Sequence, residues 1–134
     1  MPRFVRITNA TRGTTLAERC RVASSLRDRT VGLLGTDEIT PGDGLLIERS
    51  PSIHMFFMRY AIDAVFVDGA GRVTKVTEGL RPWRVVWWAP RARDCVELPP
   101  GSVEASATRT GDQLEIAELA PNSSTESQHP SVGD

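Results

Sequence analysis

Hydrophobic and polar residues alternate along most of the chain, and this period of two is typical of β-strands with one buried face. Clusters of Gly, Pro, Asn and Asp interrupt the alternation and predict turns, as at Asn9–Gly13 and Asp68–Arg72. The segments between these turns are predicted strands: Arg3–Thr8, Thr15–Ala23, Leu45–Glu48, Ser52–Met58, Ala61–Asp68, Val73–Glu78, Arg84–Trp88, Cys95–Pro99, Ser102–Arg109 and Gly111–Leu119.

One segment, Ser24–Gly35, changes to helical spacing and predicts a single short helix, with Gly35 as its stop. Many short strands with one helix must bury their apolar faces on one another. We therefore expect a mainly β, single-domain fold over residues 1–120, either a β-sandwich or a small barrel. Pro121–Asp134 contains one aliphatic residue and is predicted to be a disordered tail.

The net charge of the chain and its distribution bear on which classes of function the sequence supports. The 134 residues carry a net charge of −1 with a pI near 6.1, which argues against a general nucleic-acid binder. The charge is uneven, because residues 1–93 hold 15 basic and 9 acidic side chains while residues 94–134 hold 1 and 8. Without a membrane-length apolar run or an apolar N-terminal region, we expect a cytoplasmic protein that does not enter a membrane.

The motifs occur in an order that resembles the DUF192 (UPF0127) family of small bacterial and archaeal proteins of unknown function. They are "RTVGLLG", "GLLIE", "SIHMFFMRYAIDAVFVDGAGRV", "RPWR", "VELPPGSVE" and "TGDQLEI". The resemblance implies a compact β-sandwich or barrel. Because the family has no established catalytic residues, it implies no mechanism.

Three ionisable residues, His54, Arg59 and Asp63, interrupt the apolar stretch from Ser52 to Gly69. A cation, an imidazole and a carboxylate beside aromatic walls suit a small polar ligand. The favoured alternative is structural, with an Arg59–Asp63 ion pair and His54 bonded to backbone.

A second candidate is "RPWRVVWWAPRAR", which holds four arginines, three tryptophans and no acid. Outward-facing Trp83 or Trp88 beside Arg84 could stack a ligand or anchor a protein partner. The alternative is that these tryptophans cap the edge of the core and the arginines stack on them.

Metal and nucleophile chemistry are less well supported. His54 and Asp63 supply two metal donors where three or four are usual, and neither Glu97 nor Asp112 is spaced to complete a site. Cys95 with His54 is the candidate Cys–His pairing for a nucleophile, and both cysteines, Cys20 and Cys95, are expected to be small buried hydrophobes.

The sequence therefore predicts a binding module for a small polar ligand or a peptide, with no metal and no other cofactor. The alternatives are an enzyme of unassigned chemistry that uses His54, Asp63 or Cys95, and a purely structural partner protein. The sequence predicts neither an oligomeric state nor a pathway.

Overall fold

The computed structural model describes residues 3–23, 42–49, 53–54, 60–86, 89 and 91–120. The predicted helix at Ser24–Gly35 and the predicted tail at Pro121–Asp134 lie outside these residues, as do Arg59 and Trp88. Of the predicted strand Ser52–Met58, the described part is Ile53–His54.

The described residues form nine strands and one short helix, which confirms a mainly β fold. The elements are β1 (Phe4–Asn9), β2 (Thr14–Ala23), β3 (Asp43–Ile47), β4 (Ile53–His54), β5 (Ile62–Val67), β6 (Val73–Leu80), β7 (Val85–Val86), β8 (Asp94–Leu98), α2 (Ser102–Ser106) and β9 (Leu114–Glu118). Most strand bounds agree with the predicted segments to within one or two residues.

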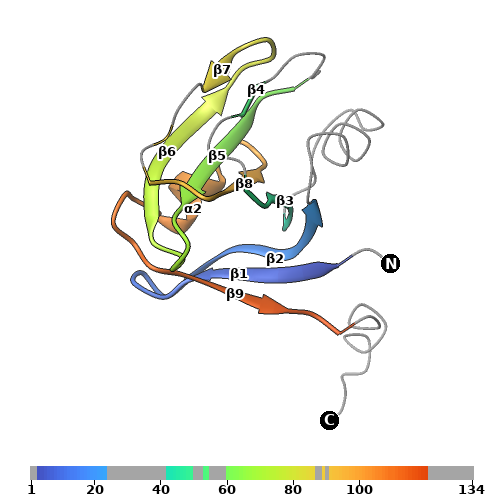
Figure 1. Cartoon of the computed structure of the whole chain (residues 1–134), viewed down its shortest axis with the longest axis vertical. Helices are drawn as coiled ribbons and strands as arrows, with labels where there is room; N and C mark the ends of the chain where they lie inside the picture. Colours follow the sequence, from blue (N-terminus) through green and yellow to red (C-terminus); the bar gives the residue numbers. More distant parts are fainter. Residues whose placement is uncertain are drawn as a thin grey trace.

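Seven strands form one sheet in the order β6-β5-β8-β3-β2-β1-β9, and β4 pairs with β7 in a separate two-stranded sheet. All pairs are antiparallel except β2 with β3, which are parallel. The large sheet curls so that its two edge strands approach at one end, where Arg72 bridges to Gln113. The result is a half-barrel, closed at that end and open where β6 and β9 diverge (Figure 1). The small-barrel prediction is confirmed in this form.

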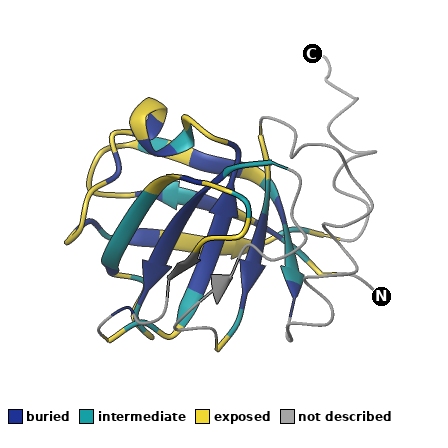
Figure 2. Cartoon of the chain, turned by 90° about the horizontal axis from the view of Figure 1, so that it is seen from above, coloured by how far each residue is buried: buried dark blue, intermediate teal, exposed yellow. Residues whose placement is uncertain are grey.

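Both faces of the central strands are buried, and all six residues of β5 are buried (Figure 2). The concave face gathers apolar residues from β1, β2, β5, β8 and β9, with Val103 of α2 packed on them. The opposite face of β3, β5 and β8 forms a second cluster around Phe66, Ile47 and Ile62. Strand β5 contributes alternate residues to both clusters, as do β3 and β8, so these neighbouring strands are buried on both faces.

One predicted strand is wrong. Ser102–Arg109 reads as alternating in the sequence, but the structure forms helix α2 over Ser102–Ser106, with Val103 and Ser106 buried at a helical spacing of three. Gly101, at φ 93°, turns the chain into the helix. The backbone N–H groups of Gly101 and Val103, at the start of α2, donate hydrogen bonds to Asp63, which is distant in the sequence. A local pattern of alternating residues cannot reveal such a contact.

Both cysteines are buried, one in each apolar cluster, as the sequence predicted, and neither forms a disulfide. Within the described ranges, no helix has the length and apolarity needed to cross a bilayer.

Candidate functional site

Asp63 is 1% exposed and is held entirely by backbone amides in the described structure. Its Oδ1 accepts a hydrogen bond from the Gly79 N–H at 2.9 Å. Its Oδ2 accepts from Gly101 at 3.1 Å and from Val103 at 3.0 Å. The carboxylate therefore ties β5 to the end of β6 and to the first turn of α2. This geometry gives Asp63 a structural role, and its part in a ligand site stays a prediction.

The Arg81–Arg84 turn, which joins β6 to β7, carries an exposed tryptophan. Trp83 is 58% exposed, and its backbone adopts a left-handed φ of 69°. The Arg84 N–H closes the turn by donating to the Arg81 carbonyl at 3.2 Å. A left-handed conformation costs a bulky residue about 1–2 kcal/mol, and such strain is concentrated at functional sites. The turn thus holds an indole on the surface at some cost to stability.

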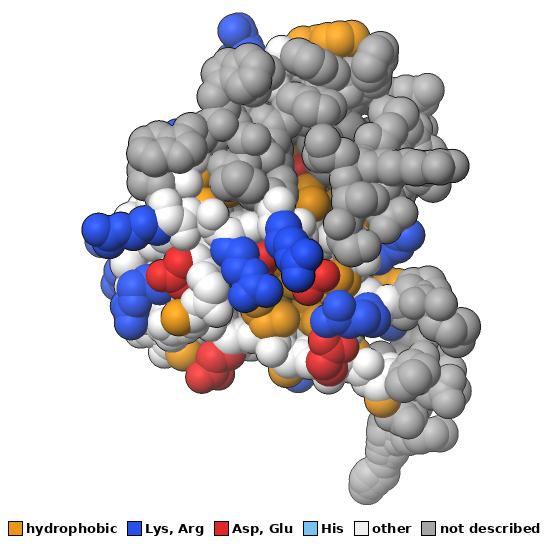
Figure 3. All heavy atoms as spheres, viewed as in Figure 1, with side chains coloured by type: hydrophobic (Ala, Val, Ile, Leu, Met, Phe, Trp, Pro, Cys, Tyr) orange, Lys and Arg blue, Asp and Glu red, His pale blue; other side chains and the backbone are white. Residues whose placement is uncertain are grey.

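Charge around this turn is basic. Arg81 and Arg84 are both exposed, and neither guanidinium makes an ion pair in the described part of the chain. Figure 3 shows basic and hydrophobic side chains at the tip of the molecule where β6 meets β7 in Figure 1. Arg81 was not among the predicted site residues, although the "RPWR" motif contains it. Two arginines without a carboxylate partner, on either side of an indole, form a surface suited to an anionic group.

The structure gives less detail for the other predicted site residues. His54 belongs to β4 and pairs with Val85 of β7, so the structure connects the His54 strand to the strand that follows the Arg81–Arg84 turn. The described hydrogen bonds of the Asp63 carboxylate go to Gly79, near the end of β6, and to the start of α2 rather than to residues of this turn.

A cavity of about 420 Å³ lies elsewhere, between the start of β2 and the segment 99–105 that contains most of α2. Thr15, Leu16 and Glu18 contribute to one wall, and Pro99 and Pro100 to another. No predicted site residue lines it. Sequence reasoning missed this cavity because its lining residues come from three separate segments of the chain and form no motif.

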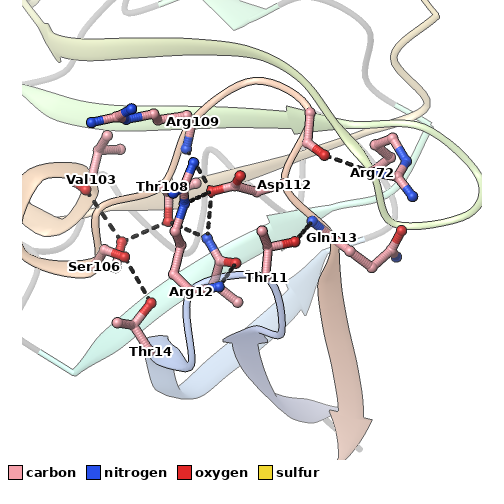
Figure 4. Close-up of polar contacts among 12 residues, drawn as sticks. Thr11, Arg12, Thr14, Arg72, Val103, Ser106, Thr108, Arg109, Asp112 and Gln113 are labelled. Atoms are coloured by element: carbon pink, nitrogen blue, oxygen red, sulfur yellow. Dashed lines mark hydrogen bonds and ion pairs between the residues drawn. The ribbon is translucent and has the colours of Figure 1, made fainter.

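A buried polar network joins the turn after β1 to the loop before β9 (Figure 4). Asp112 Oδ2 accepts from Asn9 Nδ2 at 3.0 Å, from Arg12 Nε at 3.0 Å and from the Arg109 N–H at 2.9 Å. Asn9 Nδ2 also donates to Thr108 Oγ1 at 3.1 Å. Burial raises the pKa of Asp112, but the Arg12 guanidinium and the Asn9 and Arg109 donors outweigh it and hold the pKa at about 2. The network therefore fixes the loop that closes the half-barrel.

This lowered pKa predicts acid sensitivity. A carboxylate whose pKa is lower in the folded chain stabilises it fully above the unfolded pKa, near 3.9, and loses that contribution as the pH falls toward 2. We expect the Asp112 contribution, ~1–2 kcal/mol after allowance for the half-exposed Arg12, to vanish over this window. Urea unfolding of wild type and Asp112→Asn from pH 5 to pH 2 tests it. The two stabilities should converge on acidification, and a constant difference would contradict the assignment.

The thiols do not favour nucleophilic chemistry. Burial raises the pKa of the Cys20 thiol far above its usual range, and the charges of Glu97 and Asp43 add to that effect. Cys95 is also fully buried, within the cluster around Phe66. A reactive thiol needs an exposed, electropositive surround that stabilises the thiolate. Glu97 and Asp112, considered above as metal ligands, lie in β8 and in the loop before β9, and the described residues contain no cluster of three metal-ligating side chains.

Comparison with known proteins adds a family and a fold. Residues 7–116 match the DUF192 family model, described as an uncharacterized ACR. A UPF0127 protein of Pyrococcus horikoshii is 33% identical over 114 residues, covering 81% of this chain and 96% of the relative. One from Pyrococcus furiosus is 32% identical, covering 80% and 94%.

Two solved structures share the fold. One, from Sinorhizobium meliloti and described as a putative transcription regulator, aligns with a TM-score of 0.71 at 22% identity, covering 87% of this chain and 94% of that one. The other, from Novosphingobium aromaticivorans and of unknown function, aligns with a TM-score of 0.70 at 19% identity, covering 84% and 83%. At these identities the likeness concerns the fold alone.

Proposed function

The chain belongs to the uncharacterised DUF192 (UPF0127) family, and we propose that within it this protein is a binding module for a small polar ligand or a peptide that carries acidic groups. The observation that carries the proposal is Trp83, a largely exposed tryptophan in a left-handed turn between two exposed arginines. His54, Arg59, Asp63 and Trp88 were predicted to share this site and remain proposed members of it.

The chemistry of the turn supports an anionic ligand. An exposed indole provides a rigid apolar surface, which is why tryptophan is enriched among residues that dominate binding energy. Arginine binds carboxylates in a bidentate geometry, and Arg81 and Arg84 have no competing carboxylate within the described chain. A ligand carboxylate could therefore bind a guanidinium while an adjacent flat or apolar group covers the indole.

The cost of the turn supports the same conclusion. Glycine adopts a left-handed φ without strain, so a turn selected for stability alone would favour glycine at position 83. Trp83→Gly should leave the free energy of unfolding within about 1 kcal/mol of wild type, because the relieved strain offsets the added flexibility of the unfolded chain. The same variant should lose binding.

The test is a titration followed by the indole N–H resonance of Trp83 in a two-dimensional NMR spectrum. The probes are a blocked tetraglutamate peptide and citrate, with a blocked tetralysine peptide as the charge control. We expect at least one acidic probe to shift this resonance. Arg84→Gln should weaken its binding about tenfold or more, and so should Trp83→Gly, whose binding is measured by calorimetry because that variant lacks the indole. Tetralysine should leave the resonance unchanged.

Arg109→Gln is the matched control, since Arg109 is also an exposed arginine but lies beside the Asp112 network. It should bind like wild type. Equal affinities for all the variants, or no response to either acidic probe, would contradict the proposed site and would favour a structural partner protein.

A further inference from the structure

Strand β9 forms one edge of the seven-stranded sheet (Figure 1) and presents the apolar side chain of Ile116 to solvent. Its residues from Glu115 to Glu118 are exposed, and Ile116 is 39% exposed. Its pairing with β1 is continuous, without a bulge. An exposed, regular edge strand is a template on which another strand can pair, unless charge, proline or a bulge prevents it.

The direction of the backbone groups identifies which of them are available. The Leu119 N–H donates to Phe4 at 2.9 Å and the Ala10 N–H donates to Gln113 at 2.8 Å, so the odd-numbered residues of this segment bond to β1. In an antiparallel pair the intervening residues point the other way. The N–H and C=O groups of Ile116 and Glu118 therefore point outward from the sheet.

The backbone N–H and C=O groups of Leu114 also point outward from β9, but both already form hydrogen bonds within the chain. The Leu114 N–H donates to the Gly71 carbonyl at 2.9 Å, and the Leu114 carbonyl accepts from Gln113 Nε2 at 3.1 Å. This contact is the closed end of the half-barrel. An incoming strand can therefore use Ile116 and Glu118 but cannot extend its pairing past Leu114.

We propose that a second copy of this chain pairs with this edge, in an antiparallel arrangement whose two-fold axis passes beside Ala117. In this register Ile116 of one copy lies opposite Glu118 of the other, and four backbone hydrogen bonds form. The two Ala117 residues face each other in a close pair, which a small side chain permits. The pairing joins two seven-stranded sheets through an isologous interface.

The charges of β9 fit a second copy in this register. Glu115 lies opposite Leu119 of the other copy and Glu118 lies opposite Ile116, so no glutamate directly faces a glutamate. Arg3 also binds the Glu118 carboxylate within each copy, which reduces the repulsion that would otherwise protect this edge. The strand is thus self-complementary.

The Arg81–Arg84 turn follows β6, which is the edge strand of the seven-stranded sheet opposite to β9. Pairing through β9 would leave that turn uncovered in both copies. The interface is therefore separate from the proposed ligand site, and either inference can fail without the other.

The test is sedimentation velocity over a wide concentration series of the full chain. We expect a reversible monomer–dimer equilibrium. Ile116→Pro removes the outward N–H of residue 116 but none that bonds to β1, so it should yield a folded monomer. Ala117→Pro, the matched control, removes an N–H that donates to β1 and should destabilise the fold.

Ile116→Asp covers the case in which the proline variant unfolds. It keeps the backbone N–H of residue 116 and places a carboxylate opposite Glu118 of the second copy. The dissociation constant of the dimer should therefore rise about tenfold or more. A wild type that stays monomeric throughout the series would overturn the proposal. So would an assembly larger than a dimer, or a dimer that survives in a folded Ile116 variant.

Discussion

Replacing Asp63 by alanine will lower the free energy of unfolding by about 3–5 kcal/mol, which corresponds to a fall of roughly 10–20 °C in melting temperature. The carboxylate accepts from three backbone N–H groups, those of Gly79, Gly101 and Val103. Alanine would leave these donors without an acceptor around a side chain that is almost fully buried. An unsatisfied buried donor costs about 1–3 kcal/mol, and three neighbouring ones do not add fully.

Asp68→Ala is the matched control for this variant. Asp68 also accepts from two backbone amides, those of Ala70 and Arg72, but it does so in an exposed turn where water can replace it. It should cost less than about 1 kcal/mol. Urea denaturation of both variants measures how much unfolding free energy each one loses. Equal losses would show that burial of the Asp63 hydrogen bonds does not cause the larger effect expected there.

Replacing Gly71 by alanine will cost about 2–4 kcal/mol, because it disrupts the closed end of the half-barrel. Gly71 has a φ of +84°, and a Cβ there would stand 2.7 Å from the Leu114 carbonyl oxygen. That oxygen belongs to the backbone beside the Arg72–Gln113 bridge, so it cannot move without loosening the contact between the two edges of the sheet.

Comparison with Gly111→Ala separates the two costs of the Gly71 substitution, which are the steric clash of the new Cβ and the strain of a positive φ. Gly111 has a similar φ of +96°, but a Cβ added there would meet no atom within 4 Å. It should cost only the conformational strain of about 1–2 kcal/mol. Thermal unfolding of both variants measures the difference, and indistinguishable melting temperatures would mean that the closed end adapts to a methyl group at no cost.

The strands could be predicted because their signal is local. Alternation along Thr14–Ala23 and the nearly unbroken apolar run of Ile62–Val67 reflect burial on one face or on two, and each is visible within a few residues. Helix α2 could not be predicted in this way. The amides at its start are bonded to Asp63, about 40 residues earlier, and the alternation of Ser102–Arg109 gives no indication of that partner.

The candidate site was predictable only where side-chain chemistry is distinctive. Trp83 and Arg84 were identifiable because an indole among arginines is unusual in a strand-rich domain. Asp63 was singled out as a charge in an apolar run, with Arg59 as its expected ion-pair partner. The partners that the structure describes are backbone amides, which every residue except proline possesses, so no sequence pattern identifies them.

The pairing of β1 with β9 also affects how the protein emerges from the ribosome. The first strand cannot complete its hydrogen bonds until Leu114–Glu118 has been made, more than a hundred residues later. At ordinary translation rates this delay is roughly 5–20 seconds. During that time one side of β1 has no partner strand, although its Val5 and Ile7 end fully buried. The seven-stranded sheet is therefore completed only when β9 has been made, and until then the apolar residues of β1 lack one of their neighbouring strands.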